Sequence, residues 1–192
     1  IGYTNAGKSS VFNALTQKIQ YEQDELFATL DATTKDFSLQ DEFTVTLTDT
    51  VGFIQDLPTE LVQAFKSTLE ESKNVDLLLH VIDASDANHK IHEDVVESIM
   101  KDLEMSDIPV LTVYNKLDLA DDFAPTILPN VQISIKSEAG VQQLRQAIIA
   151  KIKELFVSFE LALPYEAAYQ LPILRKIALI DTVVAEDETE TY

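Results

Sequence analysis

The sequence predicts an α/β protein with a doubly wound, mostly parallel sheet and a small C-terminal β-α-β piece. Short apolar runs of strand length alternate with longer amphipathic segments of helical period, which is typical of a sheet covered by helices on both faces. The chain has 192 residues, 46% of them hydrophobic, and can bury one sizeable core. We expect a main domain over residues 1–156 and a small subdomain with an acidic tail over 157–192.

The first part of the chain predicts a helix, a hairpin and a second helix. Residues 8–18 follow a glycine and carry apolar side chains at helical spacing. Residues 43–49 alternate between apolar side chains and threonine, which indicates a half-buried strand, and residues 37–40 are expected to pair with it through a turn at 41–42. Residues 59–73 predict a helix, because Thr59 after Pro58 is a suitable N-cap.

The second part repeats strand and helix. The apolar runs 75–82, 108–114 and 131–135 indicate strands covered on both faces. Residues 88–105 and 141–156 predict the helices between and after them. Beyond residue 156 the pattern predicts a strand over 157–163, a helix over 166–177 and a strand over 178–185.

Composition restricts the class of protein. The formal net charge is −19 and cysteine is absent, so disulfides and thiolate metal sites are excluded and a reducing, cytoplasmic location is expected. So acidic a surface repels phosphate backbones, and we expect no direct nucleic-acid binding. No apolar run is long enough to span a membrane. Because the chain begins inside a motif and without methionine, we interpret it as part of a longer protein. Either the strand that should precede the motif lies upstream, or this part of the chain is structurally incomplete.

The first motif, from Gly2 to Ser9, fits the pattern G-x-x-x-x-G-K-[ST] of a phosphate-binding loop. Glycines let the backbone N–H groups surround phosphate oxygens, and the following helix adds its positive end. Lys8 is expected to reach the β- and γ-phosphates, and the Ser9 hydroxyl to ligate Mg²⁺. The candidate phosphate-binding residues are Gly2, Tyr3, Thr4, Asn5, Ala6, Gly7, Lys8, Ser9, Ser10 and Gly52.

The second motif, Asp49-Thr50-Val51-Gly52, ends the strand 43–49. Ligands of open α/β sheets bind at the carboxyl ends of strands, so Asp49 is expected to anchor Mg²⁺ through water. The Gly52 N–H is expected to bond the γ-phosphate. One of Thr33 and Thr34 should ligate Mg²⁺ and sense the γ-phosphate. We favour Thr34, and we assign catalytic roles to Lys8, Thr34 and Gly52.

The third motif, Asn115-Lys116-Leu117-Asp118, follows the strand 108–114 and has the N-K-x-D pattern of guanine recognition. The Asp118 carboxylate can accept from both guanine N1–H and the exocyclic amine, whereas adenine would leave it unpaired. Asn115 is expected to brace the loop and the Lys116 stem to pack over the base. Ser134-Ile135-Lys136 resembles the S-A-K guanine contact, with Ile135 where alanine is usual.

The means of hydrolysis is less evident. Phe53 stands where Ras-like enzymes have a water-orienting glutamine, and the only arginines, Arg145 and Arg175, lie far along the sequence from the switch motifs. We therefore predict slow intrinsic hydrolysis, completed by a partner or a bound cation. Asn5 matches an asparagine that helps bind K⁺ in some related GTPases, which makes K⁺ a candidate cofactor beside Mg²⁺; a loop-bracing role for Asn5 is equally open.

Three histidines have structural interpretations. His80 lies in a predicted buried strand and is expected in the core or facing a switch. His89 and His92 are three apart on a predicted helix, which is a metal-binding spacing, but no third ligand is evident and a solvated face is favoured. Tyr3 is expected either to shield the phosphates or to pack on a neighbour.

Together, residues 1–156 resemble P-loop GTPases, and the finer resemblance is to the HflX family of ribosome-associated GTPases. It rests on four stretches, with Ala32 (proline is usual) and Ile135 as departures. The resemblance implies GTP and GDP as ligands. It also implies an absent N-terminal domain that contacts the large ribosomal subunit, and a small C-terminal domain. A nucleotide-gated switch with negligible hydrolysis and an Era-like or Obg-like GTPase remain alternatives. The stretches are Gly2–Ser10, Phe27–Thr34, Asp49–Glu71 and Asp76–Ser85.

Overall fold

The computed structural model describes residues 1–16, 33–40, 42–50, 52 and 75–184. A three-stranded parallel sheet has the order β3-β4-β5, and a separate antiparallel hairpin joins β1 and β2. The strands are β1 (Thr33–Gln40), β2 (Phe43–Asp49), β3 (Leu78–Asp83), β4 (Val110–Asn115) and β5 (Asn130–Gln132). The helices are α1 (Lys8–Leu15), α3 (His89–Asp102), α4 (Glu138–Leu155) and α5 (Leu171–Ile177), with 3₁₀ turns at Leu117–Leu119 and Tyr165–Gln170.

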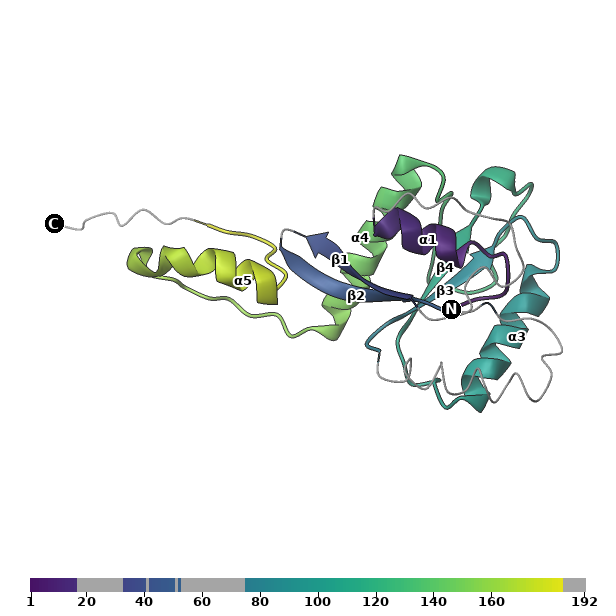
Figure 1. Ribbon diagram of the computed structural model, residues 1–192, viewed down its shortest axis with the longest axis horizontal. Coiled ribbons are helices and arrows are strands. Elements are labelled where there is room, and N and C mark those ends of the chain that lie inside the picture. Colours follow the sequence, from purple (N-terminus) through teal and green to yellow (C-terminus); the bar gives the residue numbers. More distant parts are fainter. Residues whose placement is uncertain (17–32, 41, 51, 53–74, 185–192) are drawn as a thin grey trace.

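Helices cover both faces of the parallel sheet (Figure 1). On one face, α1 and α4 pack against the strands through the largest core cluster, in which Leu15, Val113 and Leu144 are almost fully buried. On the other face, α3 packs Val96 against Leu78. This two-sided cover explains why the strands β3 and β4 are nearly continuous apolar runs, and it confirms the predicted α/β class.

The chain's first residue lies against β3. The Ile1 amine donates to Leu79 O (2.9 Å), and Ile1 O accepts from Val81 N (2.9 Å). The phosphate loop then follows directly and leads into α1, whose C-cap Thr16 bonds back to Phe12 O. The loop is thereby placed at the carboxyl end of β3, where open α/β sheets bind their ligands.

The hairpin β1–β2 extends from the body toward α5 (Figure 1). Its register pairs Thr33 with Asp49 and Phe37 with Val45. Arg145 of α4 fastens it to the body by donating to Ser38 O (2.6 Å) and lying over the Phe37 ring (4.8 Å to the centroid). The hairpin predicted at residues 37–49 is confirmed, and its first strand begins earlier, at Thr33.

The region after α4 differs from the prediction. Residues 166–177 are helical as expected, but the strands expected over 157–163 and 178–185 are not formed within the described residues, which end at 184. A strand needs a partner for its backbone groups. Phe159 and Tyr165 in this region are 71% and 94% exposed, so the apolar alternation that suggested strands is not accompanied by burial. The boundary at 156/157 remains a prediction, and the helix predicted over 59–73 lies outside the described residues.

Candidate functional site

The phosphate loop depends on its two glycines because neighbouring atoms leave no room for a side chain. Gly2 (φ 149°) and Gly7 (φ 93°) both lie in the region that favours glycine. A Cβ on Gly2 would come within 2.2 Å of Val81 O, and one on Gly7 within 2.3 Å of Asn115 Nδ2. The loop is therefore packed tightly against β3 and against the end of β4.

Lys8, at the start of α1, is held inside this loop. Its Nζ donates to Tyr3 O at 2.9 Å. Burial lowers the pKa of Lys8 to about 8, and the nearby Asp49 carboxylate partly opposes the shift. A partly desolvated ammonium at the start of a helix is suited to bind an anion such as phosphate.

The carboxylate of Asp49 reaches the phosphate loop from the end of β2. Ser9 Oγ donates to Asp49 Oδ2 at 2.7 Å, and Asp49 is 7% exposed. Gly52 lies against the phosphate loop, since a Cβ there would come within 2.8 Å of Lys8 Nζ and 2.9 Å of Thr4. Hydroxyl and carboxylate oxygens are ligands that Mg²⁺ prefers, so this pair fits the predicted magnesium site.

The two threonines proposed for the metal occupy β1. The register places Thr33 opposite Asp49 and Thr34 opposite Thr48. The Thr34 and Thr48 hydroxyls are hydrogen-bonded at 2.8 Å on an exposed face. We expect this pair to separate if Thr34 moves to bind a metal, because the hydrogen bond holds its hydroxyl within the hairpin.

The base end is assembled around Asn115, which is 1% exposed at the end of β4. Its Nδ2 donates to Ala6 O (3.2 Å), and its Oδ1 accepts from Ile135 N (3.1 Å). One buried amide thus joins the phosphate loop to the segment Ser134–Lys136. This is the bracing role predicted for Asn115.

Asp118 follows in the exposed 3₁₀ turn. A hydrogen bond from the Ser134 side chain is the largest cause that lowers the pKa of Asp118. Its own backbone N–H and the charges of Lys136 and Lys116 lower that pKa further. Asp118 is therefore an ionised acceptor at neutral pH, as recognition of two guanine donors requires. Ile135 packs its side chain against the main core cluster, while its N–H donates to Asn115 Oδ1 in the base loop.

Lys116 makes contacts that the sequence did not predict. Its Nζ donates to Asn5 O at 2.6 Å and to Asp83 Oδ2 at 2.7 Å. Asp83 was missed, although the rule that selected Asp49 applies to it, because it is a carboxylate at the carboxyl end of a parallel strand.

The histidines of α3 correct one expectation. His92 stacks on the Tyr3 ring, with centroids 3.7 Å apart and planes 8° apart, and its side chain is 19% exposed. His89 lies edge-on to Tyr114 and Phe123. These side chains are packed inward rather than on a solvated face, because α3 turns them toward the phosphate loop and β4. His80 is buried, as predicted, and burial lowers its pKa to about 3.

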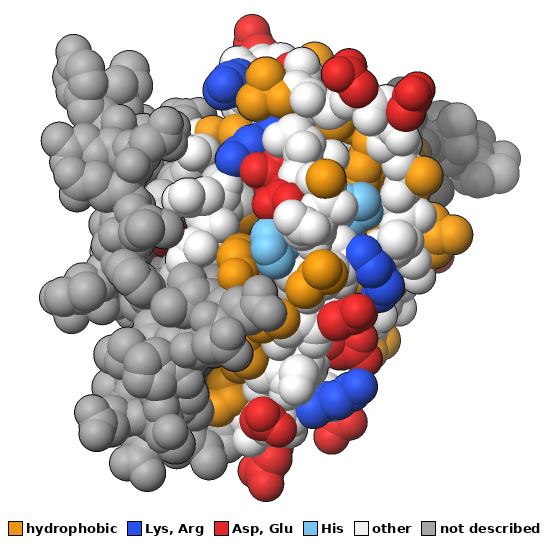
Figure 2. All heavy atoms as spheres, turned by 90° about the vertical axis from the view of Figure 1, so that its right-hand side faces the viewer, with side chains coloured by type: hydrophobic (Ala, Val, Ile, Leu, Met, Phe, Trp, Pro, Cys, Tyr) orange, Lys and Arg blue, Asp and Glu red, His pale blue; other side chains and the backbone are white. Residues whose placement is uncertain are grey.

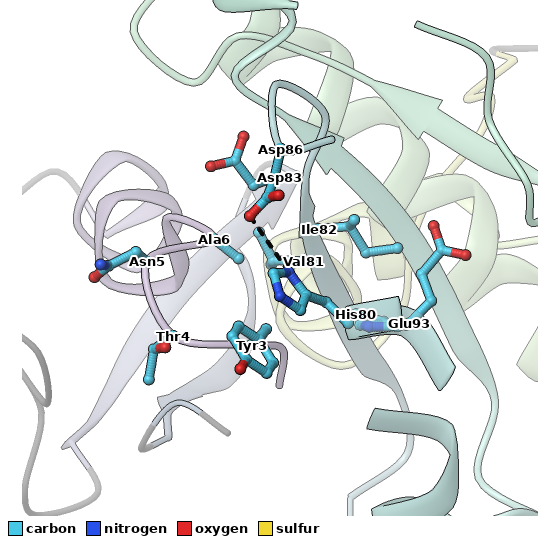
Figure 3. A pocket seen from close by; sticks show the side chains of 11 residues that line it. Tyr3, Thr4, Asn5, Ala6, His80, Val81, Ile82, Asp83, Asp86 and Glu93 are labelled. Atoms are coloured by element: carbon cyan, nitrogen blue, oxygen red, sulfur yellow. Dashed lines mark ion pairs between the residues drawn. The ribbon is translucent and has the colours of Figure 1, made fainter. Parts of the chain in front are cut away.

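A hollow of about 40 Å³ is lined by residues of the phosphate loop, of β3 and of the start of α3. Figure 3 shows Tyr3 and Ala6 of the phosphate loop on one side of it and Asp83 and Asp86 on the other. Within the described residues, no group of three or more His, Cys, Asp or Glu side chains could hold a metal ion. On the face seen in Figure 2, acidic side chains are interspersed with lysines or arginines and with histidines. Phe53 lies outside the described residues.

Comparisons with known proteins agree with this geometry. The family model described as "50S ribosome-binding GTPase" matches residues 1–116. A GTPase HflX of Alkalihalophilus pseudofirmus is 41% identical over 194 residues, covering 100% of this chain and 46% of that protein. GTPase HflX of Escherichia coli is 40% identical, covering 92% of this chain and 44% of that protein.

A solved GTP-binding protein of Sulfolobus solfataricus in complex with GDP is similar with a TM-score of 0.60. It is 27% identical, and the match covers 81% of this chain and 51% of that one. The fold and the motif-bearing loops define a P-loop GTPase domain. Because about 40% of its residues are identical to GTPase HflX proteins over nearly its whole length, the chain belongs to the HflX family of GTPases. It spans less than half the length of these curated relatives.

Proposed function

We propose that this chain binds GTP and GDP with Mg²⁺ and hydrolyses GTP. The observation that carries the proposal is the joining of phosphate loop and base loop through Asn115, whose side chain contacts both Ala6 and Ile135. Such a connection fixes the distance between the phosphate and base subsites before a ligand arrives, which reduces the ordering cost of binding.

The proposed roles follow from these contacts. Lys8 and the loop N–H groups bind the phosphates, and Asp118 with Ser134 selects guanine. Ser9 and Asp49, with Thr34 or Thr33, would hold Mg²⁺, which when bound would neutralise phosphate charge. Gly52 is proposed to bond the γ-phosphate.

The binding proposal is tested by calorimetry with GDP and with ADP in the presence of Mg²⁺. GDP is expected to bind and ADP to show no measurable heat, because adenine lacks the paired donors that Asp118 accepts. Equal affinities would contradict the role of Asp118. Absence of binding by either nucleotide would contradict the proposal for this chain.

We further propose that intrinsic hydrolysis is slow, because the Phe53 side chain cannot orient a water by hydrogen bonding. The family model's description supports the large ribosomal subunit as the activating partner. Single-turnover hydrolysis should then accelerate when large subunits are added. Negligible hydrolysis in both conditions would favour the alternative, a switch whose output is partner affinity alone.

A bound K⁺ near Asn5 is a second proposed source of activation, since a cation there would supply positive charge to the transition state. Faster turnover in K⁺ than in Na⁺ buffer is expected, and equal rates would remove K⁺ from the proposal.

A cytoplasmic location is likewise proposed. No helix in the described part of the chain has the length and apolar character needed to cross a membrane.

A further inference from the structure

Asp83 ends β3 directly beside the base loop. The parallel register pairs Asp83 with Asn115, so the next residue of the neighbouring strand, Lys116, turns back over the carboxylate. Lys116 adopts φ 63° at this turn. The resulting ion pair is 2.7 Å long, and the side chains are 28% and 19% exposed for Lys116 and Asp83. It is thus shielded from solvent more than a surface pair would be.

The second carboxylate oxygen fixes Asp83 independently of Lys116. Asp83 Oδ1 accepts from Ser85 N at 2.9 Å and from Ser85 Oγ at 2.6 Å. A carboxylate that bonds the N–H two residues ahead forms a local turn of its own. Asp83 is therefore held in place by its own loop, and it can restrain a neighbour.

Lys116 connects three loops through one ammonium group. Beside Asp83 it contacts the phosphate loop at Asn5 O, at 2.6 Å. Asn5 itself has φ 61°, a conformation that a non-glycine residue rarely adopts without support. The Lys116 contact supplies such support, and Asp83 provides the countercharge that keeps the ammonium there.

We propose that Asp83 is a positioning residue for guanine-nucleotide binding, acting through Lys116 on both the base loop and the phosphate loop. The proposal rests on the proposed nucleotide-binding function of this site. Asp83 is expected to slow nucleotide release, because opening either loop breaks a charge-assisted contact at Lys116.

The test is the release rate of fluorescently labelled GDP, measured by stopped flow for the chain and for its Asp83→Asn variant. Asparagine keeps the volume and the bond from Ser85 N, and it removes the charge facing Lys116. Release should be about 10-fold faster, at the lower end of the scale for losing one hydrogen bond to a charged group, because the pair is partly exposed. Asp94→Asn is the matched control, since Asp94 pairs with Lys90 on the exposed side of α3, and its release rate should equal that of the unchanged chain.

A double-mutant cycle separates positioning from general stability. In a Lys116→Met background, Asp83→Asn should change release less than about two-fold, because its target is gone. An equal acceleration in both backgrounds would overturn the proposal, as would an unchanged rate in the single variant. If Asp83→Asn does not fold, Asp83→Ser replaces it, since serine can still accept from Ser85 N and is too short to reach Lys116.

The outcome is distinct from failure of the proposed function. If the unchanged chain releases labelled GDP and Asp83→Asn does not alter the rate, nucleotide binding stands and the role of Asp83 is rejected. If the unchanged chain binds no GDP, both are rejected, because the positioning role has no ligand to act on.

Discussion

The base side and the magnesium side of the site differ in how far they are assembled. On the base side, Asn115 and Lys116 already hold the phosphate loop through contacts of 3.2 and 2.6 Å. On the magnesium side, Ser9 bonds Asp49, whereas the Thr34 hydroxyl is engaged with Thr48 in the hairpin. The same chain thus combines a preformed subsite with one whose threonine hydroxyl is held within the hairpin and is expected to rearrange.

This difference indicates a division of labour between the two sides. A preformed subsite reduces the ordering cost of binding, and under the proposed function it binds guanine and the phosphates common to GDP and GTP. A rearranging subsite can respond to the γ-phosphate, because a ligand shifts a conformational equilibrium only by its differential affinity for the two states. We expect substitutions on the base side to affect both nucleotides and those on the magnesium side to affect GTP more.

The largest effect is expected from Lys8→Ala. Removing the ammonium should weaken GDP binding roughly 100-fold, the scale of losing more than one hydrogen bond to a charged group. Calorimetry measures the loss. Lys101→Ala is the control, since the Lys101 side chain is 64% exposed at the end of α3. Retention of full GDP affinity by Lys8→Ala would contradict the phosphate-loop assignment.

Asp118→Asn should weaken GDP binding about 30-fold, because the amide offers only one acceptor oxygen to two guanine donors. The amide nitrogen of the new asparagine would instead donate to a base that carries an acceptor where guanine has its exocyclic amine. Xanthosine diphosphate, which has an oxygen there, should therefore bind the variant better than it binds the unchanged chain. Competition assays with both nucleotides test the inversion, and unaltered preference for guanine would exclude Asp118 from base recognition.

Alkaline pH should weaken GDP binding through Lys8. Its pKa is lowered to about 8, and bound phosphates favour the charged form and raise that pKa. Affinity is therefore fully present below about pH 8 and is lost as the pH rises through it, by roughly 8-fold between pH 7.5 and 9. Calorimetry across this range tests it. In Lys8→Arg the guanidinium stays charged, so a profile as steep as that of the unchanged chain would contradict the assignment.

The smallest effect is expected from Thr34→Ala, and it should be selective. With Mg²⁺, a non-hydrolysable GTP analogue should bind about 5-fold more weakly, whereas GDP affinity should stay constant. The variant loses one metal-binding hydroxyl, and that hydroxyl is proposed to act only in the arrangement that the γ-phosphate favours. Thr48→Val, which releases the Thr34 hydroxyl, should strengthen analogue binding. A larger effect from Thr33→Ala than from Thr34→Ala would reassign the metal to Thr33, which lies opposite Asp49.

Much of the fold was readable from periodicity. The strands β2, β3 and β4 and the helices α1, α3 and α4 lie where apolar runs and helical spacing predicted them, with ends displaced by a few residues. The failure came after residue 156. There an apolar alternation suggested strands, but alternation cannot report whether a neighbouring strand is present to accept the hydrogen bonds.

The sequence by itself determined the chemistry of the site, because a phosphate loop, a metal-anchoring carboxylate and a guanine acceptor require particular residue types at short spacings. It could not determine contacts between residues far apart in the chain. The tertiary structure alone placed Asp83 on Lys116, stacked His92 on Tyr3 and turned the Ile135 side chain into the core. These contacts depend on the register of β3 with β4 and on the packing of α3. The strand register and the helix packing are set by burial between segments far apart in the chain, and a local sequence pattern does not show which segments meet.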